Sequence, residues 1–192
     1  MPASDNNASN VTAGKPNVGG AIYVAPKGTT LPTSATGSLN SAFECLGYVS
    51  DSGLVNATDL ETTEIKAWGG DTVLTIQTSK SDKFTFTLLE ILKKAVLEFL
   101  YGSSNVTGTA LNSGLTVAVN NDDMEEVSIV INMILRDNTA KRIVIPDCKI
   151  SEIGEINYTD SEAVGYETTV TCMPDSSGNY HYEYLLKSAV SG

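Results

Sequence analysis

The chain has 192 residues, 41% of them hydrophobic and 18% charged, and 23 acidic against 12 basic residues give a formal net charge of −11. This balance argues against a protein that grips nucleic acid, because phosphate binding needs a basic patch. No apolar run approaches the ~20 residues of a membrane span, and the N-terminus lacks the basic start and apolar stretch of a secretory signal, so we expect neither membrane insertion nor secretion.

Residues 1–19 are rich in Asn, Ser, Gly and Pro and hold almost no large apolar side chain. Such a composition cannot bury enough surface to order itself, so the sequence predicts a flexible N-terminal arm. A short strand, Ala21 to Val24, follows and ends at Pro26. Residues 27–41 then form a polar loop. Residues 20–192 are predicted to be one domain.

The segment from Gly47 to Asp71 holds the single tryptophan of the chain, Trp68, which is followed by Gly69 and Gly70. Two glycines before a strand permit a sharp turn with positive φ. Aromatic residues beside such turns anchor them in a core or at a subunit interface. From the residues alone we favour a core position for Trp68 over an interface position, and we predict a long loop around it.

Alternating apolar residues predict two strands, Val73 to Lys80 and Lys83 to Leu88, joined as a hairpin by a turn at Ser81 and Asp82. In the second strand the phenylalanines and Leu88 share one face while threonines take the other, which is typical of a half-buried strand.

One helix is predicted directly after this hairpin. Thr87 and Glu90 have the spacing of a capping box, in which each side chain bonds the backbone N–H of the other residue. Apolar residues then recur with helical spacing, so we predict a helix from Leu88 to Tyr101 with Gly102 as its C-cap. Its length suits packing on one face of a sheet.

The remainder of the chain is rich in strand patterns with turn signals between them. The predicted strands are Leu115 to Asn120, Val127 to Leu135, Lys141 to Ile145 ending before Pro146, Lys149 to Tyr158, Val164 to Met173 and Tyr180 to Leu186. Asp137-Asn138 and the Pro174 to Asn179 segment are predicted turns. The element order predicts a mainly β fold with one α-helix, a β-sandwich or open barrel with the helix packed on the sheet.

No constellation of residues indicates catalysis. The single histidine, His181, stands among tyrosines and is expected to be a surface or packing residue, since neither a Cys/His metal cluster nor a nucleophile motif accompanies it. The acidic segment 122–126 lacks the ligand rhythm of a calcium loop and is interpreted as solvated. Cys172 is predicted to be a buried thiol within a strand. We therefore expect no enzyme activity, no cofactor and no metal.

Five short segments carry a family likeness, and they occur in the family's order between about residues 20 and 186. They are Gly20 to Pro26, Leu46 to Leu54, Ile65 to Val73, Ile153 to Ile156 and Gly165 to Thr169. Together they resemble the major tail tube proteins of long-tailed, siphovirus-type bacteriophages.

This resemblance implies a structural virion protein, of which six copies form a ring and stacked rings form a hollow tube that conducts phage DNA into the host. In that family each subunit lends about four strands to a continuous inner barrel, which removes exposed sheet edges. The implied partners are further copies of the chain, the tape measure protein, the tail-tip or distal tail protein and the tail terminator. The resemblance further implies that duplex DNA passes without specific binding and that the protein resides in the virion tail after assembly in the bacterial cytoplasm.

Two sets of candidate residues follow from this implication. The candidate subunit or ring interface comprises Trp68, Gly69, Gly70 and Tyr48, and the candidate acidic lumen or surface comprises Glu152, Glu155, Glu162 and Glu167. Between Ile150 and Leu186 seven carboxylates occur without any lysine or arginine. A like-charged lumen would offer DNA phosphates no binding sites.

Two other functions remain open from the residues. The first is a monomeric β-sandwich binding module for a carbohydrate or receptor, with Tyr180, Tyr182 and Tyr184 near its site. The second is a small hydrolase that uses two carboxylates, which would need to converge in a pocket.

Overall fold

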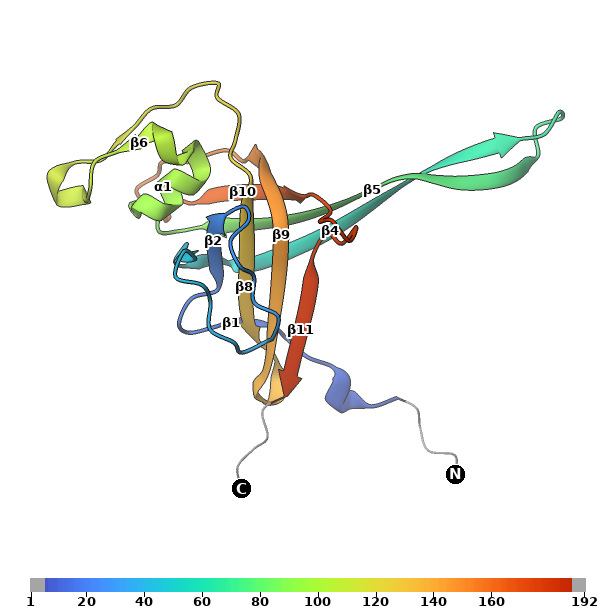
Figure 1. Ribbon diagram of the computed structural model, residues 1–192, viewed down its shortest axis with the longest axis horizontal. Helices are drawn as coiled ribbons and strands as arrows, with labels where there is room; N and C mark the ends of the chain where they lie inside the picture. Colours follow the sequence, from blue (N-terminus) through green and yellow to red (C-terminus); the bar gives the residue numbers. More distant parts are fainter. Residues whose placement is uncertain (1–5, 188–192) are drawn as a thin grey trace.

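Figure 1 shows the computed structural model of the protein, which describes residues 6–187. Within these residues the fold is mainly β with a single α-helix, α1 (Lys94–Tyr101), as predicted. The strands are β1 (Lys15–Pro16), β2 (Ile22–Pro26), β3 (Glu44–Cys45), β4 (Val49–Lys66), β5 (Thr72–Leu88), β6 (Val106–Thr107), β7 (Thr116–Val117), β8 (Val127–Ile134), β9 (Thr139–Ile153), β10 (Tyr166–Cys172) and β11 (Tyr182–Lys187). Short 3-10 turns occupy Ala8–Asn10, Ser103–Asn105, Leu111–Ser113 and Arg136–Asn138.

Nine strands join in one antiparallel sheet, in which β3, β2, β8, β9, β10, β5 and β4 are neighbours in that order; β1 pairs with β8 and β11 with β9. Strand β9 serves two layers, because residues 139–144 pair with β11 and residues 148–153 pair with β10. In Figure 1 the layer of β8, β9 and β11 crosses the direction of β4, β5 and β10. The sheet therefore folds over itself to enclose a core, as orthogonally packed layers do.

The core lies between these layers and beneath α1. Phe84, Phe86 and Leu88 alternate along β5 and are at most 2% exposed, which confirms the half-buried strand. Phe86 stacks on Phe99 of the helix with ring centroids 6.5 Å apart. The helix contributes Val96 and further apolar residues to the same cluster, so it packs on the sheet as predicted.

The helix is shorter than predicted, and the predicted capping box is wrong. Thr87 and Leu88 belong to β5, where they pair with β10. The residue before the helix, Lys93, makes no side-chain cap, whereas Gly102 ends the helix with a φ of 91° as expected. Pairing and burial at the end of β5 outweighed a local capping pattern, because a buried ladder satisfies more backbone groups than one cap does.

The predicted hairpin is also wrong in its connection. β5 runs without a turn from Thr72 to Leu88 and pairs with β4 along almost its full length, so residues 49–66 are a strand rather than a loop. Ser81 and Asp82 lie within β5. Their polar side chains belong to a continuous strand and do not mark a turn. The turn of the hairpin lies between Ala67 and Asp71.

The strand predictions after residue 120 hold within about two residues, with two exceptions. The strand predicted to reach Tyr158 ends at Ile153, and no strand ends before Pro146. Instead of ending there, β9 continues through Pro146 to Ile153. The register against β8 shifts between Val127 and Ile129, opposite this proline, and the Ser128 hydroxyl donates to the Pro146 carbonyl at 2.7 Å. A bulge of this kind accommodates a residue that lacks an N–H. Asp137 and Asn138 have positive φ values of 56° and 55°, which confirms the turn there.

Two irregular segments are tied to the sheet. The buried guanidinium of Arg142 donates to the carbonyls of Ser34 and Gly37 at 2.9 and 2.7 Å, and this holds the polar loop 27–41. The Thr12 hydroxyl accepts from the Arg136 N–H at 2.8 Å, so part of the N-terminal segment lies along β8. Residues 1–5 lie outside the described residues, and the flexibility of residues 1–19 stays a prediction.

Two cysteines are buried opposite each other, as expected for Cys172. Cys148 and Cys172 are paired positions of β9 and β10, and both are free thiols. Burial raises the pKa of Cys172 to about 12 and raises that of Cys148 well above its usual range. Both thiols therefore stay protonated at pH 8, where thiolate is needed for reaction.

We accordingly expect a thiol reagent at pH 8 to modify Cys45 alone, which is half-buried, in the native protein. All three cysteines should react once urea exposes them. Mass spectrometry of the labelled chain measures this directly. Rapid native labelling of Cys148 or Cys172 would contradict the packing described here.

Candidate functional site

The outer part of the β4–β5 hairpin projects far from the body of the molecule (Figure 1). Every residue of this projection, residues 55–80, is exposed, and we call it the arm. An isolated two-stranded hairpin is marginally stable in water, because neither of its faces is covered. A bare arm of this length therefore indicates a surface for contact with another molecule.

Large apolar side chains gather near the end of the arm. Ile65, Trp68, Leu74 and Ile76, which we call the arm tip, are each at least 44% exposed. Ile65 pairs with Leu74, and Thr63 pairs with Ile76. This register puts Ile65, Leu74 and Ile76 on one face of the ribbon. Exposed apolar clusters of this kind mark interaction sites.

Trp68 lies in the turn that closes the arm. The Ala67 N–H donates to the Asp71 carbonyl at 2.8 Å, and the following Gly69 and Gly70 have φ values of 120° and 101°, as the turn prediction requires. Trp68 is fully exposed (108%), so the core position favoured from the sequence is wrong. The residues next to Trp68 in sequence would suit a turn packed in the core as well as a turn at the end of a projecting hairpin. A position at an interface stays a prediction.

A buried carboxylate fixes the place where the arm leaves the core. Asp82, 1% exposed, accepts from Asn56 Nδ2 at 2.8 Å and from Thr58 Oγ1 at 3.0 Å. His181 Nδ1 lies 2.5 Å from its other oxygen, and the imidazole packs edge-on against Phe84. We call Asn56, Thr58, Asp82 and His181 the arm root. The packing role expected for His181 is confirmed, whereas no sequence signal singled out Asp82.

The segment before β11 makes a second contact with the arm. The Tyr180 hydroxyl donates to the Lys80 carbonyl at 2.9 Å, and the Lys80 ammonium lies 5.7 Å from the centre of the Tyr180 ring. The arm is therefore held by residues about 100 positions away in sequence, and its direction is a property of the whole fold.

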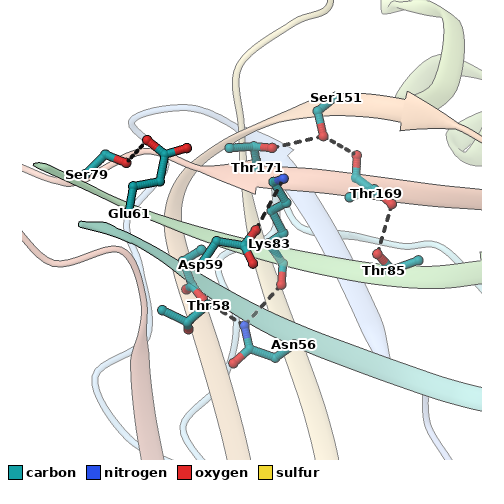
Figure 2. Close-up of polar contacts among 11 residues, drawn as sticks. Asn56, Thr58, Asp59, Glu61, Ser79, Lys83, Thr85, Ser151, Thr169 and Thr171 are labelled. Atoms are coloured by element: carbon teal, nitrogen blue, oxygen red, sulfur yellow. Dashed lines mark hydrogen bonds and ion pairs between the residues drawn. The ribbon is translucent and has the colours of Figure 1, made fainter. Parts of the chain in front are cut away.

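One face of the sheet presents hydroxyl groups (Figure 2). The hydroxyls of Thr85 and Thr169 lie 2.9 Å apart, and Thr171 donates to the Ser151 hydroxyl at 2.9 Å. These residues come from β5, β10 and the end of β9, and their neighbours on the other face form the core. We call this side of β4, β5, β10 and residues 149–153 the threonine face.

Toward the arm the threonine face becomes charged (Figure 2). Lys83 and Asp59 form an ion pair at 3.5 Å, and Ser79 donates to Glu61 at 2.9 Å. The face is mainly polar and solvated, with Val55, which pairs with Thr85, as an exposed apolar residue. It therefore suits contact with water rather than with another protein.

The four predicted acidic residues are all exposed but do not form one group. Glu152 pairs with Thr169 and Glu167 pairs with Thr87, which places these two on the threonine face. Glu155 and Glu162 lie in the irregular segment between β9 and β10.

Comparison with known proteins identifies the family. A sequence model described as "Phage tail tube protein" matches residues 3–191. The chain belongs to this family. The tail tube protein finds no match among curated proteins. Tail tube proteins are structural components of the phage tail, so this protein is located in the virion tail.

Two solved structures have a similar course of the chain. One is the sheath–tube complex of an extracellular contractile injection system, PVC, in its extended state, with 9% identity, a TM-score of 0.39 and coverage of 90% of this chain and 93% of that one. The other is the tube-terminating cap of the anti-feeding prophage, with 8% identity, a TM-score of 0.39 and coverage of 97% and 100%.

The tyrosines considered for a binding module serve packing in the tail tube protein. Tyr182 and Tyr184 stack with ring centroids 6.4 Å apart and pack beside Phe43. The Tyr182 hydroxyl donates to Asp175 at 2.5 Å, which raises the pKa of the tyrosine and lowers that of the aspartate. Nothing observed supports the carbohydrate-binding alternative.

The fourth candidate interface residue, Tyr48, lies directly before β4, whereas Trp68 lies just after it. Tyr48 is 77% exposed, and its N–H donates to Glu90 Oε1 at 3.0 Å. The structure therefore places Tyr48 and Trp68 at opposite ends of one strand and does not bring them together within a single tail tube protein.

The acidic segment after β7 is engaged with lysines. Lys149 lies 3.6 Å from Asp123, and Lys27 lies 2.6 Å from both Glu126 and Asp147. The two carboxylates raise the pKa of Lys27. Within residues 6–187 of the tail tube protein, no group of three His, Cys, Asp or Glu residues is placed to hold a metal ion. No helix in that range is long and apolar enough to cross a membrane.

Proposed function

We propose that six copies of this tail tube protein form a ring, and that rings stack into the hollow tube of a siphovirus-type tail that conducts DNA into the host cell. The single observation that carries this proposal beyond the family is the arm, residues 55–80, which is exposed throughout. A hairpin of this length has no covering in one copy. Contacts with neighbouring copies would cover it.

The threonine face is proposed to line the lumen. It belongs to four neighbouring strands, and β4 at its edge has a free side that can pair with another subunit. Six copies would give about 24 strands, which at ~4.8 Å spacing and ~40° tilt close into a barrel of roughly 48 Å backbone diameter. Side chains narrow this by about 10 Å, and the channel still admits duplex DNA.

The subunit and ring contacts are proposed to involve Trp68, Gly69, Gly70 and Tyr48, together with the N-terminal segment. The tape measure protein, the tail-tip or distal tail protein and the tail terminator are the proposed further partners. Assembly would take place in the host cytoplasm. The chain is proposed to act without catalysis and without a cofactor.

Electron microscopy of the purified protein in negative stain, combined with light scattering, tests the assembly. We expect hollow rings or tubes, alone or after tail-tip proteins are added. A homogeneous monomer at high concentration, with and without the tail-tip proteins, would contradict the proposal.

The lumen assignment predicts an effect of charge on DNA ejection. Lys83 on the threonine face is paired with Asp59. A lumen that also carries Glu152 and Glu167 repels DNA phosphates, and at ~0.15 M salt the repulsion acts within ~8 Å of the wall. Replacing both by lysine in a phage is expected to slow ejection several-fold while tubes still assemble. The matched control is Glu44→Lys, an exposed glutamate of β3. Normal ejection kinetics with the lysine-bearing lumen would refute the assignment.

A further inference from the structure

A large hollow on the described surface lies between three segments of the body. It has a volume of about 460 Å³, against about 160 and 210 Å³ for two others. Residues 16–21, Cys45, residues 47–49, Glu90 and Lys93 line it, and we call it the groove. A space of this size is within the ~300–1,000 Å³ range of sites that enclose a ligand or a large side chain.

The groove and Trp68 lie at opposite ends of one strand. Tyr48 and Val49 line the groove, and Val49 is the first residue of β4. Trp68 follows the last residue of β4 by two positions, after 18 strand residues that span roughly 60 Å at ~3.3 Å each. Figure 1 shows β4 running from the body to the free end of the arm. Within one chain Trp68 cannot reach the groove.

The two surfaces match in chemistry. Trp68 offers two apolar ring faces and one N–H donor. The groove offers apolar contact through Val18 (103% exposed) and Tyr48, and an acceptor through the Glu90 carboxylate. The Lys93 ammonium at its rim could lie over an indole face, a favourable arrangement for a cation.

Charge permits the two surfaces to approach. Two copies that each carry −11 repel, so contact is favoured where the local charges cancel. Lys66 and Asp71 flank Trp68, one of each sign. Glu90 and Lys93 stand 3.3 Å apart in the groove, again one of each sign. Neither surface therefore adds a net charge to the contact.

From this geometry we infer that the groove receives Trp68 of a second copy of the chain. The inference rests on the proposed self-assembly and names the surface that accepts the arm. The contact joins two different patches of the same chain, so each copy donates one Trp68 and accepts another. Such head-to-tail contacts propagate into closed rings or open tubes.

The single tryptophan of the chain supplies the measurement. On assembly the emission of Trp68 should move to shorter wavelength, and acrylamide should quench it several-fold less. Val18→Glu places a charge in the groove at a fully exposed position, so it should leave folding intact. We expect it to raise the concentration needed for assembly at least about tenfold and to abolish the emission shift. Val119→Glu, at another exposed valine outside the groove, is the control and should do neither.

The outcomes separate this inference from the proposed function. Tubes that form while Trp68 stays quenchable would overturn the inference and leave the tube proposal standing. The same holds for an emission shift that survives Val18→Glu, because Trp68 would then be buried elsewhere, for instance against tail-tip proteins. Equal loss of assembly in Val119→Glu would also count against it. Absence of any assembly would overturn both.

Discussion

Shortening the arm is expected to abolish tube formation while leaving the body of the protein folded. Replacing residues 61–79 by Asn-Gly would join Leu60 and Lys80, which are paired, through a two-residue hairpin turn. Every residue removed is exposed, so the free energy of unfolding should change by less than about 1 kcal/mol. The surface proposed to contact neighbouring copies would be lost with the arm tip.

Urea unfolding and electron microscopy of the same sample measure both halves of this expectation. The matched control replaces Thr62 by serine, which leaves the arm at full length. Tubes of normal appearance from the shortened chain would show that the arm does not carry the assembly contact. A large loss of stability would show instead that the arm packs on the body.

Replacing Asp82 by alanine is expected to lower the free energy of unfolding by about 2–4 kcal/mol. The buried carboxylate satisfies donors of Asn56, Thr58 and His181, and each donor left unpaired in a buried site costs about 1–3 kcal/mol. We expect a loss smaller than the sum of three such costs, because Asn56 and Thr58 are also exposed to solvent. The loss should be visible in urea unfolding of the monomer.

The matched control is Asp59→Ala, on the opposite face of the same ribbon. Its ion pair with Lys83 is exposed, so its loss should cost less than about 0.5 kcal/mol. Asp82→Asn keeps one oxygen for the two donors on β4 and should give an intermediate loss. Equal effects of the two aspartate-to-alanine changes would contradict the role of the arm root.

The sequence was sufficient for the elements whose faces differ in polarity. Phe84, Phe86 and the threonines between them predict a half-buried strand, and the apolar spacing from Val96 predicts a helix on the sheet. Turn residues such as Asp137 and Asn138 are local signals, because their backbone conformation is set by the residues themselves. These parts need no knowledge of what lies across the sheet.

The arm and the arm root were not predictable, because their structure depends on residues that are distant in the sequence. The sequence predicts Val73 to Lys80 as a strand, whereas residues 55–66 of the arm carry charged, polar and apolar side chains on both faces, which is also the composition of a loop. Only pairing with β5 over many positions makes them a strand. Asp82 looked like a turn residue, since its partners Asn56 and His181 are 26 and 99 positions away. The residues next to Trp68 likewise do not indicate that its turn lies far from the body of the molecule.

Strand β9 gives this subunit an unusual mechanical character. Its 15 residues are shared by both layers, hydrogen-bonded to β8 and β11 along one part and to β10 along the next. Hinging one layer against the other would require breaking backbone hydrogen bonds within a continuous strand. A tail built from such subunits is therefore expected to bend at the joints between them. With the arms as the proposed contacts, its flexural rigidity is expected to depend on the arms rather than on the cores.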